Sequence, residues 1–247
     1  MKNMYNVHLR RILDIILKYP VLCTLFAFNT LCVYSQSGRQ LIPVEWKAIK
    51  REVKKNPEKV KDLVARLAAP KIDTTLTFSD RILAFYGQSF LTNDGEEGFV
   101  LDMDKLSKEG KYDECLEAAD KVLDKNPLNL DALIMKGNVL LVMSKDSVRW
   151  PDVTQDDAMP YFNRAMRIFN TIATTGDGSE KHPFYVTKVS DEYNFMRYYL
   201  DLWEYEGQYV TGHCDAIKLK EKSLYYDQPE IYFDVTRVFE LERLMFK

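Results

Sequence analysis

The sequence predicts an α+β protein that is mostly helical, with antiparallel helix pairs followed by a small C-terminal antiparallel β-sheet. Two helices are predicted within residues 110–144, where apolar side chains recur at three- and four-residue steps on both sides of Pro127. Short segments at 208–211, 214–219 and 231–235 are typical of strands joined by turns. Hydrophobic residues make up 46% of the 247 residues, so the chain can bury a sizeable core.

The helix pair within residues 110–144 is the best-defined part of the sequence. Pro127 forces the residue before it out of helical geometry, so we expect the first helix to end near Lys125. Asn129 can cap a second helix, which we expect to continue to Ser144. The apolar stripe of the first helix consists of Tyr112, Cys115, Leu116, Ala119, Val122 and Leu123.

This segment resembles the tetratricopeptide repeat, a pair of antiparallel helices that stacks on similar pairs. It departs from the repeat at Cys115, Val122 and Leu133, where alanine, alanine and tryptophan are preferred. A second, less complete match lies at residues 158–169, and an ordinary helical hairpin remains the alternative. The matching residues are Gly110, Tyr112, Ala119, Leu123, Pro127 and Gly137.

The tetratricopeptide resemblance implies a groove that binds another protein and is lined by the first helix of each repeat. Some tetratricopeptide proteins grip a C-terminal carboxylate with lysines and asparagines, but only Asn138 fits that pattern here. We therefore predict an unknown protein partner without that particular contact. The outward residues of the helix that starts at Asn129 would line the groove, namely Asp131, Ile134, Asn138, Leu141 and Val142.

The first 35 residues are predicted to be a secretory signal peptide. Basic residues precede a mostly apolar run from Val21 to Tyr34, and cleavage after Ser35 would leave Gln36 at the N-terminus. An uncleaved signal anchor is the alternative, and it would be the protein's sole contact with a membrane. We expect an exported protein that is periplasmic or extracellular.

The chain divides into four predicted segments: a signal peptide (1–35), an N-terminal helical segment (36–95), a tetratricopeptide-like helical region (96–180) and a β-rich region (181–247). Thr77 and Asp80 fit a capping box at the start of a helix. The formal net charge is −3, and no basic stripe is present, which argues against nucleic acid as a partner.

A glycine-rich loop offers an alternative function, the binding of a small molecule, a carbohydrate or an ion. Gly176, Asp177 and Ser179 lie in this loop, and Asp191 and Glu192 follow it. Carboxylate oxygens suit calcium, but the loop lacks the spacing of the twelve-residue calcium loop. The glycines are better explained as turn residues, and an enzymatic role at the loop is a further alternative.

No catalytic residue, cofactor or metal is predicted elsewhere. If His213, Cys214 and Asp215 lie on one strand, they cannot converge, because neighbouring side chains point to opposite faces. Cys115 fits a small packing position, which favours a buried free thiol. The aromatic residues within 193–209 fit a core better than a platform for carbohydrate.

Three further segments carry a more specific resemblance. They are TTLTFSDRILAFYGQSFL, ATTGDGSEKHPFYVTKVSDEY, and GHCDAIKLKEKS with the PEIYFDV that follows it. These segments resemble an uncharacterised family of exported bacterial proteins, the domain of unknown function 4919, over most of residues 75–240. The resemblance implies an exported protein with a helical, repeat-like body and a β-rich tail, and it implies no activity.

The functional hypothesis from the sequence is therefore a protein–protein interaction module in the cell envelope. The alternative is a ligand site, which could also be enzymatic, at the loop from Gly176 to Ser179. A purely structural part of an envelope complex is the third possibility.

Overall fold

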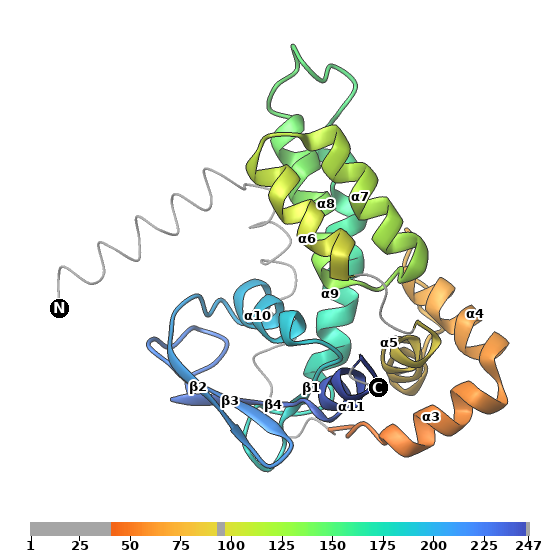
Figure 1. Cartoon of the computed structure of the whole chain (residues 1–247), viewed down its shortest axis with the longest axis vertical. Helices are drawn as coiled ribbons and strands as arrows, with labels where there is room; N and C mark the ends of the chain where they lie inside the picture. The colour runs from red at the N-terminus through yellow and green to blue at the C-terminus, as the bar shows by residue number, and fades with distance from the viewer. Residues whose placement is uncertain (1–40, 93–96, 246–247) are drawn as a thin grey trace. The chain divides into compact units, whose positions relative to one another are not determined.

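The described part of this chain is mostly helical. The computed structural model describes residues 41–92 and 97–245, and the predicted signal peptide, its cleavage site and the alternative membrane anchor lie outside this part. None of the helices in these ranges is long and apolar enough to cross a membrane. The helices, drawn in Figure 1, are α3 (Trp46–Lys55), α4 (Pro57–Ala68), α5 (Phe78–Leu91), α6 (Glu97–Lys108), α7 (Tyr112–Lys125), α8 (Leu130–Met143), α9 (Met159–Ala173), α10 (Val189–Tyr198) and α11 (Thr236–Met245), with a 3₁₀ turn, η1 (Gln155–Asp157).

The predicted boundaries of the central helix pair are confirmed. α7 ends at Lys125, and Asn126 is extended before Pro127, as the proline requires. The side chain of Asn129 caps α8 by accepting a hydrogen bond from the backbone N–H of Ala132 at 3.0 Å. Gly110 joins α6 to α7 with a φ of 72°, a conformation that glycine adopts without strain.

The predicted capping box at the start of α5 is also confirmed. The side chain of Thr77 accepts a hydrogen bond from the backbone N–H of Asp80 at 3.2 Å, and the carboxylate of Asp80 accepts one from the backbone N–H of Thr77 at 3.0 Å. Two backbone donors that would otherwise lack partners at the helix start are thereby satisfied.

Consecutive helices pack against each other as antiparallel pairs. α6 packs on α7, α7 on α8 and α8 on α9, and α6 also reaches α8. At the contact between α8 and α9, a Cβ atom on Gly137 would lie 2.7 Å from the ring of Phe162, so these helices approach closely because residue 137 is glycine. The N-terminal helices join the same unit, because α4 and α5 both contact α9.

The sheet has four strands, β1 (Phe184–Tyr185), β2 (Tyr205–Thr211), β3 (Cys214–Leu219) and β4 (Glu230–Asp234), in the order β1-β4-β3-β2. β2, β3 and β4 are antiparallel, as predicted, but β1 pairs with β4 in parallel, so the sheet is mixed. The added strand β1 makes the sheet mixed because α10 and the β2–β3 hairpin separate it from β4, so the chain enters β4 in the same direction as β1.

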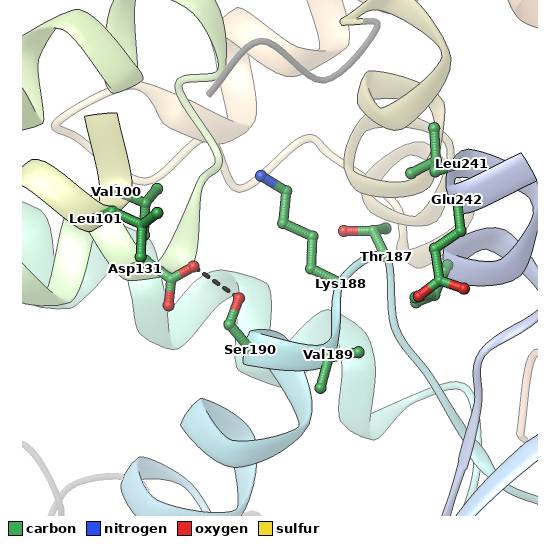
Figure 2. Close-up of a pocket in the computed structure, with 10 residues that line it drawn as sticks. Val100, Leu101, Asp131, Thr187, Lys188, Val189, Ser190, Leu241 and Glu242 are labelled. Atoms are coloured by element: carbon green, nitrogen blue, oxygen red, sulfur yellow. Dashed lines mark hydrogen bonds between the residues drawn. The ribbon is translucent and has the colours of Figure 1, made fainter. Parts of the chain in front are cut away.

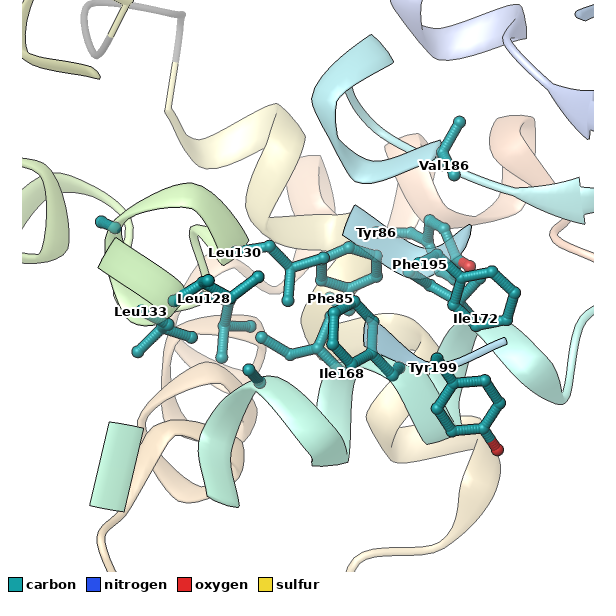
Figure 3. Packing of buried hydrophobic residues seen from close by; sticks show 14 of the residues in the cluster. Phe85, Tyr86, Leu128, Leu130, Leu133, Ile168, Ile172, Val186, Phe195 and Tyr199 are labelled. Atoms are coloured by element: carbon teal, nitrogen blue, oxygen red, sulfur yellow. The ribbon is translucent and has the colours of Figure 1, made fainter. Parts of the chain in front are cut away.

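One hydrophobic cluster extends from the first described helices to the sheet. Figure 3 shows part of it, including Leu133 of α8, Ile168 of α9, Phe85 of α5 and Phe195 of α10. The aromatic centre of the cluster is Phe195 of α10, which is fully buried. Its ring lies 4.8 Å from that of Phe184 in β1 and 6.3 Å from that of Phe233 in β4, which fixes α10 on the sheet.

The last helix, α11, is anchored to α5 by a buried arginine. The Nε of Arg237 donates to the hydroxyl of Ser89 at 3.1 Å, and its Nη1 donates to the carboxylate of Glu240 at 2.9 Å. Its guanidinium also lies 3.8 Å from the centre of the Phe90 ring. The last described helix is therefore joined directly to α5, which lies far from it in the sequence.

Candidate functional site

A pocket of about 360 Å³ lies between α6, α8, the start of α10 and α11 (Figure 2). Half of its lining is aliphatic, and Leu101 is 73% exposed to solvent although it is a leucine. Figure 2 shows the side chain of Lys188 extending into the pocket. The lining residues are Val100, Leu101, Asp131, Thr187, Lys188, Val189, Ser190, Val238, Leu241 and Glu242.

Asp131 fixes one wall of this pocket. Its carboxylate accepts a hydrogen bond from the hydroxyl of Ser190 at 2.7 Å and another from the side-chain amide of Asn194 at 2.7 Å (Figure 2 draws the first). These bonds tie α8 to the first two turns of α10. The pocket is therefore held in shape by polar contacts between side chains of the protein itself.

Asp191 holds the start of α10. Its Oδ2 accepts hydrogen bonds from the backbone N–H groups of Thr187 and Lys188, both at 3.1 Å, and from the hydroxyl of Thr187 at 2.8 Å. Burial, and then the negative charge of Asp131, raise the pKa of Asp191 to about 6. Asp191 is thus a helix-capping residue whose bonding capacity is largely used within the fold.

The structure brings only part of the predicted groove to the surface. Asp131 lines the pocket, and Asn138 and Val142 are half-buried. Ile134 and Leu141 are buried, so their assignment to an outward face was wrong. The reason is that α8 is packed by α6, α7, α9 and α10, and α10 covers part of the face that the sequence left open.

The loop from Gly176 to Ser179 is a closed turn. The backbone N–H groups of Asp177 and Gly178 both donate to the carbonyl of His182, and the side chain of Asp177 accepts from the backbone N–H of Ser179 at 2.9 Å. Gly178 has a φ of 79°. Much of the polar capacity of the loop therefore serves the turn, which supports the structural explanation of its glycines.

The loop also docks onto the sheet. The carbonyl of Gly178 accepts hydrogen bonds from the hydroxyl of Tyr226 at 3.0 Å and from the backbone N–H of Tyr232 at 2.9 Å. A Cβ atom on Gly176 would lie 2.1 Å from the carbonyl oxygen of Pro183, so the two arms of the turn are in close contact.

Within residues 41–92 and 97–245, no three His, Cys, Asp or Glu side chains are grouped so that they could hold a metal ion.

Glu192, from the loop alternative, lies in a different environment, between α10 and the sheet. Glu192 is 0% exposed, and neither of its carboxyl oxygens has a hydrogen-bond partner among the described residues. Asp215 of β3, also buried, has one oxygen without a partner, and its other oxygen accepts from the side chain of Gln208. Gln208 in turn accepts from the hydroxyl of Tyr193 at the surface. These hydrogen bonds connect the hydroxyl of Tyr193, through Gln208, to the buried carboxylate of Asp215, whereas no described hydrogen bond reaches the carboxyl group of Glu192.

The environment of Glu192 favours its neutral form. Burial, and then the negative charges of Asp215 and Asp191, raise its pKa to about 9. Burial also raises the pKa of Asp215. The pair could not be predicted from the sequence, because its members lie on different elements and neither has a local pattern that signals burial.

The segment from His213 to Asp215 does not form a converging triad. His213 lies in the turn of the β2–β3 hairpin beside Gly212, and its Nε2 is 3.3 Å from the carboxylate of Asp234. Cys214 and Asp215 are successive residues of β3, so their side chains point to opposite faces. Both described cysteines are free and buried, as expected for Cys115.

The fold defines a mostly helical α+β protein with antiparallel helix pairs and a four-stranded mixed sheet. The family model described as Domain of unknown function (DUF4919) matches residues 47–243. The chain therefore belongs to this family, and the match includes α4 and all but the first residue of α3, as well as the three segments that carry the resemblance. No curated protein and no solved structure matches the chain.

Proposed function

We propose that this protein is an exported protein-interaction module and that the pocket between α6, α8, α10 and α11 receives an apolar side chain from a short segment of its partner. The observation that carries the proposal is the exposed aliphatic lining, above all Leu101. Exposed apolar surface in a concave site is typical of places where another molecule binds. Polar residues around the lining, such as Asp131 and Glu242, would limit which segments fit.

The position of the pocket supports a tetratricopeptide-like mode of binding. α6 and α8 are the first helices of two consecutive antiparallel pairs, α6–α7 and α8–α9, and they contact each other. In tetratricopeptide proteins the first helices line the groove that holds the partner. Here the chain's own α10 and α11 close part of that face, which leaves a small pocket rather than a long groove.

Photo-crosslinking tests this role of the pocket. With a photoreactive phenylalanine analogue at position 101, we expect one stoichiometric partner to be crosslinked in exporting cells. The additional substitution Val189→Glu should lower the yield about tenfold or more, because burying one aliphatic side chain contributes about 1.5–3 kcal/mol. The readout is the amount of adduct on a denaturing gel, with its identity established by mass spectrometry.

Val148 provides the matched control, since it is 93% exposed and does not line the pocket. The same photoreactive residue at position 148 should give no specific adduct, and Val148→Glu should leave the yield from position 101 unchanged. Equal adducts from positions 101 and 148 would remove the basis for assigning partner binding to the pocket.

Export is tested separately by the mass of the mature protein. We expect the form recovered outside the cytoplasm to begin at Gln36, because the sequence from Val33 to Ser35 suits signal peptidase. Intact-mass measurement of the periplasmic and extracellular fractions gives the answer. A full-length chain confined to the cytoplasm would contradict the proposal, and a full-length chain in the membrane fraction would favour the signal anchor.

A further inference from the structure

Two arginines of α9 are covered by other parts of the chain without meeting an acidic residue. Arg167 is only 8% exposed. Its Nε donates to the carbonyl of Asn163 at 3.2 Å, and its Nη2 donates to the carbonyl of Ala69, at the end of α4, at 2.6 Å. The other terminal nitrogen, Nη1, is buried and has no partner among the described residues.

Arg164, one turn earlier on α9, also has a buried N–H donor without an acceptor. Its Nη2 donates to the carbonyl of Pro127 at 3.0 Å, whereas its Nε is buried without a partner in the described part of the chain. A guanidinium group stays protonated in proteins, so it cannot relieve this situation by becoming neutral. Buried N–H donors of a charged group that lack an acceptor are costly to the fold.

A third arginine adds to the positive charge. Arg81 lies in the first turn of α5, a helix that packs on α9, and its side chain is half-buried. Burial lowers the pKa of both α9 arginines, and the charges of Arg164 and Arg81 lower that of Arg167 further. No described carboxylate acts in the opposite direction on either group.

Two other arginines of this protein have acidic partners. Arg237, also buried, is paired with Glu240, and Arg66 is paired with Asp73 at 2.8 Å. Carbonyl oxygens satisfy some donors of Arg164 and Arg167, but they supply no full negative charge. The cluster on α9 and α5 therefore lacks the acidic partner that the chain provides for Arg66 and Arg237.

We propose that Arg81, Arg164 and Arg167 form a site for a phosphate-type oxyanion, either free phosphate or the phosphate of a lipid headgroup. Such an anion supplies the missing charge and several acceptor oxygens, and guanidinium groups bind it through paired N–H donors. Arg81 and Arg164 are the half-buried members of this site, and Arg167 is the buried one. None of the three lines the pocket assigned to the partner, so this site is independent of the proposed function.

Thermal unfolding in inorganic phosphate tests the site, with the ionic strength held constant by sodium chloride. We expect the melting temperature to rise saturably with phosphate, because a ligand that binds only the folded state stabilises it. Arg81→Gln and Arg164→Gln should each weaken the apparent affinity about tenfold or more. Arg51→Gln and Arg197→Gln, at exposed positions, are the controls with the same change of charge and should leave the affinity unchanged.

A second arm distinguishes the two sources of the phosphate group. Sedimentation with phosphatidylglycerol vesicles, compared with phosphatidylcholine vesicles, should show binding that Arg81→Gln abolishes if the source is a lipid headgroup. Arg81→Gln removes only a half-buried side chain, so we expect this variant to stay folded. The proposal is overturned if phosphate raises the melting temperature no more than sodium chloride does and the protein does not sediment with the vesicles. It is also overturned if the Arg81→Gln and Arg164→Gln variants respond as the unchanged protein does.

Discussion

Phe195→Ala should lower the free energy of unfolding by about 3–5 kcal/mol, the usual cost of removing a fully buried phenylalanine ring. Phe195 is 0% exposed, and it is the residue through which α10 contacts both α9 and the sheet. The change would leave a cavity where three structural elements meet. Urea denaturation followed by circular dichroism measures the loss. The rings around Phe195 belong to Phe169, Phe184, Tyr199 and Phe233.

Phe78→Ala is the matched control, because the ring of Phe78 is 49% exposed. We expect this substitution to change the free energy of unfolding by only about 0.5 kcal/mol. If both variants lose the same small amount, α10 is not the joint between the helices and the sheet, and the pocket that depends on its position would need to be reassigned.

The second large effect has the opposite sign, since Glu192→Gln should stabilise the protein at neutral pH. The pKa of Glu192 rises from 4.5 to about 9 in the folded state. The stability that the protonated Glu192 contributes is fully present below pH 4.5 and is lost as the pH rises toward 9. The reason is that Glu192 loses its proton at lower pH in the unfolded chain than in the folded protein. At about 1.4 kcal/mol per pH unit, the loss reaches about 3 kcal/mol at pH 7. Glutamine cannot ionise and avoids this loss.

Thermal or urea unfolding from pH 4 to pH 9 checks the sign. The advantage of Glu192→Gln should be close to zero at pH 4, reach about 3 kcal/mol at pH 7 and continue to grow toward pH 9. Glu117→Gln, at an exposed position, removes the same charge and should show no comparable trend. An advantage independent of pH would mean that Glu192 is not held neutral by its surroundings.

The central helices could be read from the sequence because their signals are local. Pro127 ends α7, Asn129 caps α8, and Gly137 marks where α8 and α9 approach closely. Each of these effects acts within one helix end or one helix contact, so the residue type alone predicts it. The parallel pairing of β1 with β4 depends on where the intervening elements fold, and residue types near Phe184 do not encode that.

The candidate pocket was only partly predictable for the same reason. Its walls come from α6, α8, α10 and α11, and only Asp131 belonged to the groove expected on α8. The burial of Ile134 and Leu141 follows from the packing of other helices around α8, which a helical pattern cannot reveal. The acid pair of Glu192 and Asp215, and the unpaired arginines of α9, likewise become visible only when distant segments are placed together.

The docking of α11 on α5 has a consequence for binding strength. α11 supplies Val238 and Leu241 to the pocket, and it is held in place by Arg237 through Ser89 and Phe90. A molecule in which α11 has come loose therefore has an incomplete pocket. If the pocket binds the partner proposed above, its apparent affinity is reduced in proportion to the fraction of molecules with α11 detached, so a change at Ser89, outside the pocket, would weaken association without altering any contacting residue.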